Sequence, residues 1–116
     1  MSRALHIAFR NMDSSEAAEA LVRQRAMELE HYAQRISACR VVLDCTNRQN
    51  HVGRLYSVHL DISVPGGTIV VNRDAGSNRV HADLQGAIRE AFDNAKRQLQ
   101  DRQRRIEEAE RRLQME

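Results

Sequence analysis

The segment "YSVHLDISVPGGTIVVNR", residues 56–73, carries the strongest structural signal in the chain. Apolar and polar side chains alternate along its first half, which is typical of a strand with one face buried. The apolar positions are Tyr56, Val58, Leu60, Ile62 and Val64. The residues "PGG", 65–67, favour a tight turn, and "TIVVNR", 68–73, then returns as a second strand. The segment therefore predicts an antiparallel hairpin with one dry face and one wet face.

Two further strands are predicted upstream of this hairpin. Residues 4–9 alternate in the same way, and residues 38–45 form a second strand-like stretch with Cys39 and Cys45 on its apolar side. Extended chain between the two cysteines separates them by roughly 20 Å, which is too far for a disulfide. We therefore expect both thiols to be reduced and buried.

A helix is expected between these two upstream strands. Asp13 or one of the serines that follow it caps the helix, and Asp13 with Glu16 has the spacing of a capping box. Apolar residues then recur at helical intervals to about Gln34. Those residues are Ala18, Leu21, Val22, Leu29 and Tyr32.

A second and much longer helix is predicted from about Ala82 to Leu113. At about 100° per residue its apolar side chains fall within a stripe about 120° wide, as expected of a helix docked on a core. The stripe consists of Leu84, Ala87, Ile88, Ala91, Phe92, Ala95 and Leu99. A helix of this length spans roughly 48 Å, so it should extend beyond a sheet of this size.

The order of elements is strand, helix, strand, strand, strand, helix, joined by polar loops at 46–54 and 74–80. A right-handed helical crossover makes the first two strands parallel, and the remaining pairs are antiparallel. The prediction is an α+β fold, a two-layer sandwich in which two helices pack on one face of a four-stranded mixed sheet. We expect residues 1–105 to form one domain and residues 106–116 a charged helical extension or a frayed tail.

Several classes of protein are excluded by what the sequence lacks. No apolar run is long enough to span a bilayer and no signal pattern opens the chain, so we expect a cytoplasmic protein without a membrane partner. The histidines and cysteines show no metal-ligand spacing, and no phosphate-binding glycine motif or nucleophile elbow is present. We therefore expect no cofactor, no metal and no enzymatic activity. The least favoured alternative is an enzyme that uses His6, His59 and Asp61 on the wet sheet face.

Basic residues give the best indication of function. The net charge is only +2, but all but one of the 18 basic residues are Arg, and many lie on the long helix. Arg89, Lys96, Arg97 and Arg104 form an arc, the outer basic arc, that the core cannot cover. Arg suits bidentate phosphate contacts, although a GC-rich genome would also favour Arg codons. With 3% aromatic residues the chain has few platforms for stacking bases, so a nucleic acid partner would be a structured RNA read through phosphates and shape.

Over about residues 4–105 the chain resembles the ribosome hibernation-promoting factor family, which includes the ribosome-associated inhibitor and the sigma modulation protein. The resemblance rests on the strand order and on three stretches, "ISACRVVLD", "GRLYSVHLDISVPGGTIVVNR" and "HADLQGAIREAFDNAKRQLQDRQRR". It departs from the family at Gln85, where an aromatic residue is common, and at Glu28 and His31, where basic residues are common. The absence of a carboxy-terminal dimerisation domain points to a short-type factor.

The resemblance implies a ribosome-associated translation inhibitor. Such a protein binds the small ribosomal subunit, in 30S or 70S particles, through rRNA in the channel for messenger and transfer RNA, during stress or stationary phase. The positions that the resemblance assigns to RNA contact are Arg25, Arg89, Lys96, Arg97, Arg102, Arg104 and Arg105. Arg23 is added because its helical position is exposed. Asp83 matches the acidic residue at the start of the family's second helix and is expected to cap that helix.

An alternative function is a protein-protein interaction module. Beyond Leu99 the apolar seam continues with Ile106 and Leu113 at seven-residue spacing, interrupted by Arg102 and Ala109. This pattern is too short to establish a coiled coil, but it allows weak homo-oligomerisation through the carboxy-terminal helix.

Overall fold

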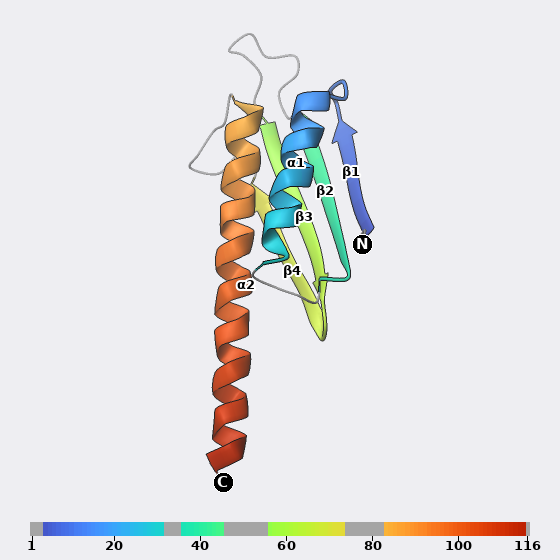
Figure 1. The fold of residues 1–116 in the computed structure, drawn as a ribbon. Helices are drawn as coiled ribbons and strands as arrows, with labels where there is room; N and C mark the ends of the chain where they lie inside the picture. Colours follow the sequence, from blue (N-terminus) through green and yellow to red (C-terminus); the bar gives the residue numbers. More distant parts are fainter. Residues whose placement is uncertain (1–3, 32–35, 46–55, 74–82, 116) are drawn as a thin grey trace.

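The computed structural model describes residues 4–31, 36–45, 56–73 and 83–115 and shows a two-layer α+β sandwich (Figure 1). The elements in chain order are β1 (Ala4–Arg10), α1 (Glu16–Leu29), β2 (Ala38–Cys45), β3 (Tyr56–Val64), β4 (Gly67–Arg73) and α2 (Leu84–Met115). The predicted order of strands and helices is confirmed. The predicted loops at 46–54 and 74–80 lie outside the described residues.

The four strands form one mixed sheet in the order β1-β2-β3-β4. β1 pairs with β2 in parallel, with Ile7 opposite Val41, as a helical crossover requires. β2 and β3 are antiparallel, with Val41 opposite Leu60, and so are β3 and β4, with Leu60 opposite Val71. The four residues form one apolar row across the sheet, so the alternation read from the sequence sets the buried face.

The hairpin between β3 and β4 turns at Pro65 and Gly66. Gly66 has φ +83°, in the left-handed region that glycine enters without steric cost. β4 begins at Gly67, one residue before the predicted strand. The turn places the end of the hairpin below α1 in the view of Figure 1, at the height of the middle of α2.

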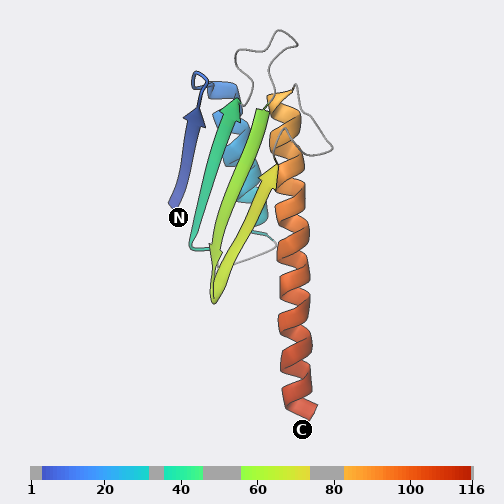
Figure 2. The same cartoon turned by 180° about the vertical axis from the view of Figure 1, so that it is seen from behind.

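Both helices cover the same face of the sheet (Figures 1 and 2). The core fills the space between the layers, and the predicted alanines Ala87, Ala91 and Ala95 are fully buried, which lets α2 approach the sheet closely. The largest fully buried side chains are Leu43, Leu60, Ile62, Ile88, Val22, Val41 and Val58. Cys39 and Cys45 are both free thiols buried on this side, as expected.

Neither of the described helices covers the opposite face of the sheet (Figure 2). His6 is exposed there, and His59 and Asp61 are half-buried, which confirms the wet face. Apolar side chains also lie on this face: Val42 is only 7% exposed among its neighbours on adjacent strands, and Val70 is 49% exposed.

α1 begins where the sequence allowed but ends earlier than predicted. Ser15 caps it, because its Oγ accepts a hydrogen bond from the backbone N–H of Ala18 at 3.2 Å, so the cap is a following serine and not Asp13. The helix ends at Leu29 and not near Gln34. Its last turn contains Glu28 but no basic residue, which is unfavourable at the negative end of the helix dipole.

α2 starts at a cap and continues far beyond the sheet. The Asp83 carboxylate accepts a hydrogen bond from the backbone N–H of Gln85 at 3.1 Å, which confirms the expected capping role. The helix has 32 residues and therefore spans about 48 Å, within a molecule whose longest dimension is 62 Å. Side chains 103–114 are all exposed. The helix is continuous across residue 105, and a domain division there stays a prediction.

None of the helices in the described ranges has the length and apolar character needed to cross a membrane.

Candidate nucleic-acid interface

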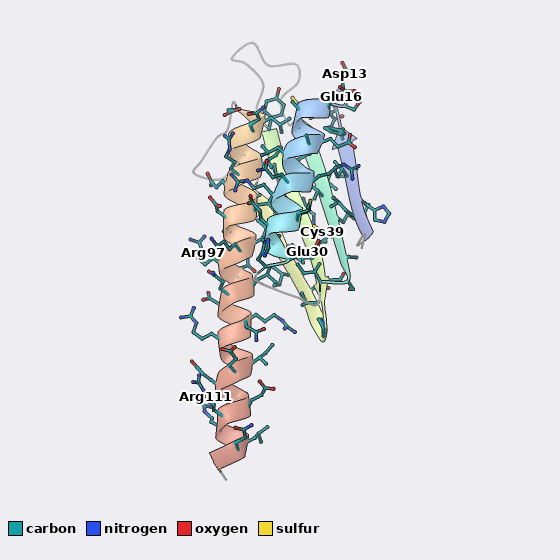
Figure 3. The ribbon with its side chains drawn as sticks, in the orientation of Figure 1. Asp13, Glu16, Glu30, Cys39, Arg97 and Arg111 are labelled. Atoms are coloured by element: carbon teal, nitrogen blue, oxygen red, sulfur yellow. The ribbon has the colours of Figure 1, made fainter. Side chains whose placement is uncertain are left out.

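The outer basic arc lies on the side of α2 that faces away from the sheet. At about 100° per residue the core stripe centres near 20° from Leu84, whereas Arg97 and Arg104 fall near 200–220°. Arg89, Arg97 and Arg104 are exposed, and Lys96 is half-buried at the border with α1. Figure 3 shows Arg97, and Arg111 further along the helix, projecting from the side opposite α1. Because the apolar stripe of α2 is docked on the sheet, the basic side chains of the arc are directed away from the core.

Two of the α2 residues assigned to RNA contact do not lie on this arc. Arg102 falls in line with the core stripe, just beyond the end of the sheet, and its Nη2 donates a hydrogen bond to the carbonyl oxygen of Pro65. It therefore links the extension of α2 to the β3–β4 turn. Arg105 is exposed, about 80° from the stripe centre on the side away from Lys96. The structure thus divides the α2 cations over more than one face.

Three of the assigned arginines have carboxylate partners on their own helix. Arg23 pairs with Glu19 at 2.8 Å, and Arg104 pairs with Asp101. The side chain of Arg23 is 58% exposed, so this pair is screened by water and contributes little to stability.

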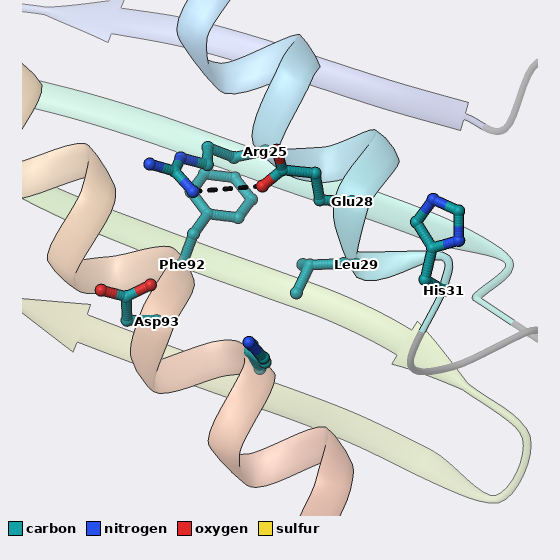
Figure 4. Close-up of a pocket in the computed structure, with 7 residues that line it drawn as sticks. Arg25, Glu28, Leu29, His31, Phe92 and Asp93 are labelled. Atoms are coloured by element: carbon teal, nitrogen blue, oxygen red, sulfur yellow. Dashed lines mark hydrogen bonds and ion pairs between the residues drawn. The ribbon is translucent and has the colours of Figure 1, made fainter.

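The third pair lies in a hollow between α1 and α2. Arg25 donates to Glu28 at 3.1 Å, and its side chain is only 29% exposed. The hollow has a volume of about 160 Å³ and is lined by Arg25, Glu28, Leu29, His31, Phe92, Asp93 and Lys96. Figure 4 shows the α1 and α2 side chains facing each other across it. Among the described residues, the Nε atom of Arg25 is buried and has no hydrogen-bond partner.

Sequence reasoning selected Arg25 and Lys96 but missed the two carboxylates beside them. Glu28 was noted only as a departure from the family pattern, and no role was assigned to Asp93. The helical wheels contained a usable signal, because Arg25 falls inside the apolar stripe of α1, between Leu21 and Ala18, and Phe92 lies at the edge of the stripe of α2.

The sheet face does not assemble the residues of the enzyme alternative. His59 Nε2 lies 3.3 Å from an Asp61 carboxylate oxygen. His6 on β1 is opposite Arg40 on β2, and Arg40 is opposite Asp61 on β3, so a cation lies between His6 and the pair. No group of three or more metal-binding side chains occurs in the described part of the chain.

Among the described residues, a core thiol has a clearly shifted pKa. Burial raises the pKa of Cys39 from 9.0 to about 11, and the negative charge of Asp61 adds to the effect. A thiol with this pKa is neutral at physiological pH and is a poor nucleophile.

Fold and surface together define a small α+β protein whose two helices cover one side of its sheet, with exposed basic residues on the outer side of α2. Residues 5–107 match the family model described as "Sigma 54 modulation protein / S30EA ribosomal protein". The chain belongs to this family, which confirms the resemblance found in the sequence.

Solved structures share the fold at low sequence identity. The N-terminal domain of Protein Y from Thermus thermophilus superposes with a TM-score of 0.68 at 21% identity, covering 86% of this chain and 98% of that one. A ribosomal subunit interface protein from Coxiella burnetii superposes with a TM-score of 0.66 at 15% identity, covering 86% and 97%. No curated protein matches the chain.

Proposed function

We propose that this protein binds the small ribosomal subunit and inhibits translation by occupying the channel for messenger and transfer RNA, during stress or stationary phase. Membership of a family described as S30EA ribosomal proteins supports a ribosomal partner. So does the likeness in fold to a ribosomal subunit interface protein. The observation that carries the proposal is the outer basic arc, which the docked apolar stripe of α2 directs away from the core.

Binding through this surface requires no chemical step. Arginine guanidinium groups fit phosphate oxygens bidentately, and a rigid helix fixes their spacing. Ala87, Ala91 and Ala95 have no exposed surface, so α2 is held tightly to the sheet and the backbone that carries these cations is ordered before binding. A protein seated in this way would inhibit by steric exclusion.

Sedimentation tests the proposal directly. A stationary-phase lysate is separated on a sucrose gradient, and the protein is expected to travel with 30S or 70S particles and to leave them at high salt, because phosphate contacts release counterions. Protein that stays at the top of a low-salt gradient would rule out the proposed function.

Charge reversal locates the binding surface. Changing Lys96→Glu together with Arg97→Glu is expected to abolish co-sedimentation while circular dichroism and thermal unfolding stay close to those of the native protein. The matched control changes Arg10→Glu together with Arg40→Glu, two exposed cations of the strands. The control makes the same change in net charge, so retained binding there would show that position and not total charge matters.

A second candidate function is self-association through the extension of α2. It is favoured by the exposure of two apolar side chains on an otherwise polar helix, Ile106 at 36% and Leu113 at 75%. Light scattering of the full chain tests this candidate. If the candidate is right, Ile106→Gln with Leu113→Gln reduces the measured mass, and a mass of one chain for the native protein at all concentrations excludes it.

A further inference from the structure

The hollow between α1 and α2 has a charge balance that does not suit a phosphate group. Arg25 and Lys96 bring two positive charges to its lining, and Glu28 and Asp93 bring two negative charges. A bare phosphate entering the hollow would meet both signs, and the carboxylates would oppose it. The phosphate-binding surface is better placed on the outer basic arc, where Arg89 and Arg97 are exposed.

A neutral ligand with both donors and acceptors matches this lining much better. Glu28 offers carboxylate oxygens that only accept, and Arg25 offers guanidinium N–H groups that only donate. The two groups are neighbours, since Nη1 of Arg25 lies 3.1 Å from an oxygen of Glu28. An edge that presents a donor beside an acceptor would engage both at once. Nucleobases have such edges and carry no net charge.

Size and floor also fit a single base. The volume of about 160 Å³ is close to that of a cavity of about 150 Å³ known to hold benzene, so it is large enough for the six-membered ring of a base, which carries the hydrogen-bonding edge. Leu29 and Phe92 supply apolar surface beneath the charged groups. Figure 4 shows the Arg25–Glu28 ion pair beside the Phe92 ring, with the Asp93 carboxylate on the α2 side of the hollow.

The state of Arg25 adds a second reason to expect a ligand. Its Nε atom is buried and hydrogen-bonds to nothing among the described residues, which is an unfavourable condition for an N–H group. A base with an acceptor such as O6 or N7 would allow the guanidinium to turn and satisfy its donors. A guanidinium plane can also stack on a base, which lessens the need for exposed aromatic rings.

We propose that this hollow holds one unstacked base of the bound RNA, and that it prefers guanine. Guanine presents two adjacent donors, N1–H and the N2 amino group, to the carboxylate of Glu28, and O6 beside them accepts from Arg25. Uracil has a single N–H donor flanked by carbonyl oxygens, which would face the carboxylates unfavourably. This inference rests on the proposed function for its RNA, but the base-binding chemistry can be measured without ribosomes.

Nuclear magnetic resonance of the whole ¹⁵N-labelled protein provides the test. The four ribonucleoside 5′-monophosphates, inorganic phosphate and ribose 5-phosphate are titrated separately to about 10 mM, a range that detects a Kd of about 1 mM, which corresponds to about 4 kcal/mol of binding free energy. We expect the guanine nucleotide to shift the amide signals of 25–29 and 92–96 in a saturable way and to bind several-fold more tightly than the uracil nucleotide. Equal shifts with inorganic phosphate, equal affinity for all four nucleotides, or no shift in these segments would each overturn the proposal.

A pair of glutamates on the same helix supplies matched variants. Glu28 and Glu19 are both paired with an arginine on α1, but only Glu28 lines the hollow. Glu28→Gln should weaken the guanine nucleotide about tenfold, because one of two hydrogen bonds to a charged acceptor is lost. Glu19→Gln should leave the affinity unchanged. An unchanged affinity in Glu28→Gln, with a well-dispersed spectrum that shows the fold intact, would refute the assignment of the carboxylate.

The two proposals fail in different ways. If the protein sediments with ribosomes but the guanine nucleotide does not bind, only the base site is wrong. If the nucleotide binds as expected but the protein stays off the ribosome, the ribosomal function is wrong and the base site stands with another RNA as its partner.

Discussion

Neutralising Arg89 and neutralising Arg102 should affect different properties of the protein, although the sequence analysis assigned both residues to RNA contact. Arg89 is exposed on the outer basic arc, in the second turn of the helix. Arg102 donates to the carbonyl oxygen of Pro65 and lies against the β3–β4 turn, where a Cβ atom at Gly66 would stand 3.5 Å from its Nη2. We therefore expect Arg89→Gln to affect RNA binding and Arg102→Gln to affect stability.

The expected magnitudes separate the two roles. Loss of one phosphate contact lowers the slope of log K against log salt concentration by roughly 0.7–0.9, so Arg89→Gln should show this change while the free energy of unfolding moves by less than about 0.5 kcal/mol. Arg102→Gln removes a hydrogen bond at the edge of the fold, at a cost of about 1 kcal/mol, and that cost lowers Tm by about 4 °C. Its salt slope should stay that of the native protein.

Two measurements on the same set of proteins decide the matter. Ribosome co-sedimentation at a series of potassium chloride concentrations gives the slope, and urea unfolding gives the stability. Arg40→Gln, a neutralisation on the open sheet face, controls for net charge and should change neither quantity much. The reasoning is refuted if Arg102→Gln lowers the salt slope by the amount expected of Arg89→Gln and its urea midpoint of unfolding equals that of the native protein.

The remaining predictions concern the scaffold. Gly66→Ala should destabilise the protein by about 1 kcal/mol in thermal unfolding, because φ +83° is strained for a residue with a side chain. Gly67→Ala is the control, since there is open space around its Cβ position. Ser15→Ala should cost about 1 kcal/mol in urea unfolding through loss of the helix cap, whereas Ser14→Ala should have little effect; equal losses would contradict the cap assignment. The raised pKa of Cys39 means that the unfolded chain releases a proton before the native one does. The free energy of unfolding should therefore be unaffected by this group below pH 9 and fall by about 2–3 kcal/mol as pH rises to about 11, and Cys39→Ala should remove that part of the pH dependence.

Most of the fold follows from patterns that are local in the sequence. Strict alternation in residues 56–64 and the turn at Pro65 and Gly66 set the hairpin and its buried face, and the apolar stripe of α2 set its docking. The sequence analysis placed the end of α1 too late, because apolar residues continue at helical spacing beyond the last residue that packs in the core. Leu29 is the last α1 side chain in the core, and the chain must leave the helix layer soon afterwards to enter β2.

The candidate site could be predicted only in part for a related reason. A helical wheel shows that Arg97 points away from the core, because direction depends only on the position of the stripe. It does not show that the sheet ends before Arg102, which decides that this residue meets a turn and not solvent. Nor does it show that α1 and α2 run side by side closely enough to bring Arg25 to Phe92. These facts depend on element lengths and on packing between segments far apart in the sequence.

The ion pairs of the helix layer indicate which of its arginines should contribute most to the proposed RNA binding. An exposed pair such as Arg23 with Glu19 contributes at most about 1 kcal/mol, so a phosphate can displace the carboxylate at little cost to the fold. The displaced carboxylate then remains close to the RNA and repels it, which offsets part of the gain. Arg104 beside Asp101 is subject to the same loss. Arg89, for which no such pair occurs among the described residues, should therefore contribute more to binding than either paired arginine. The corollary is that Glu19→Gln and Asp101→Asn should tighten ribosome binding, and weaker binding in both variants would show that the pairs orient the arginines for RNA and do not compete with it.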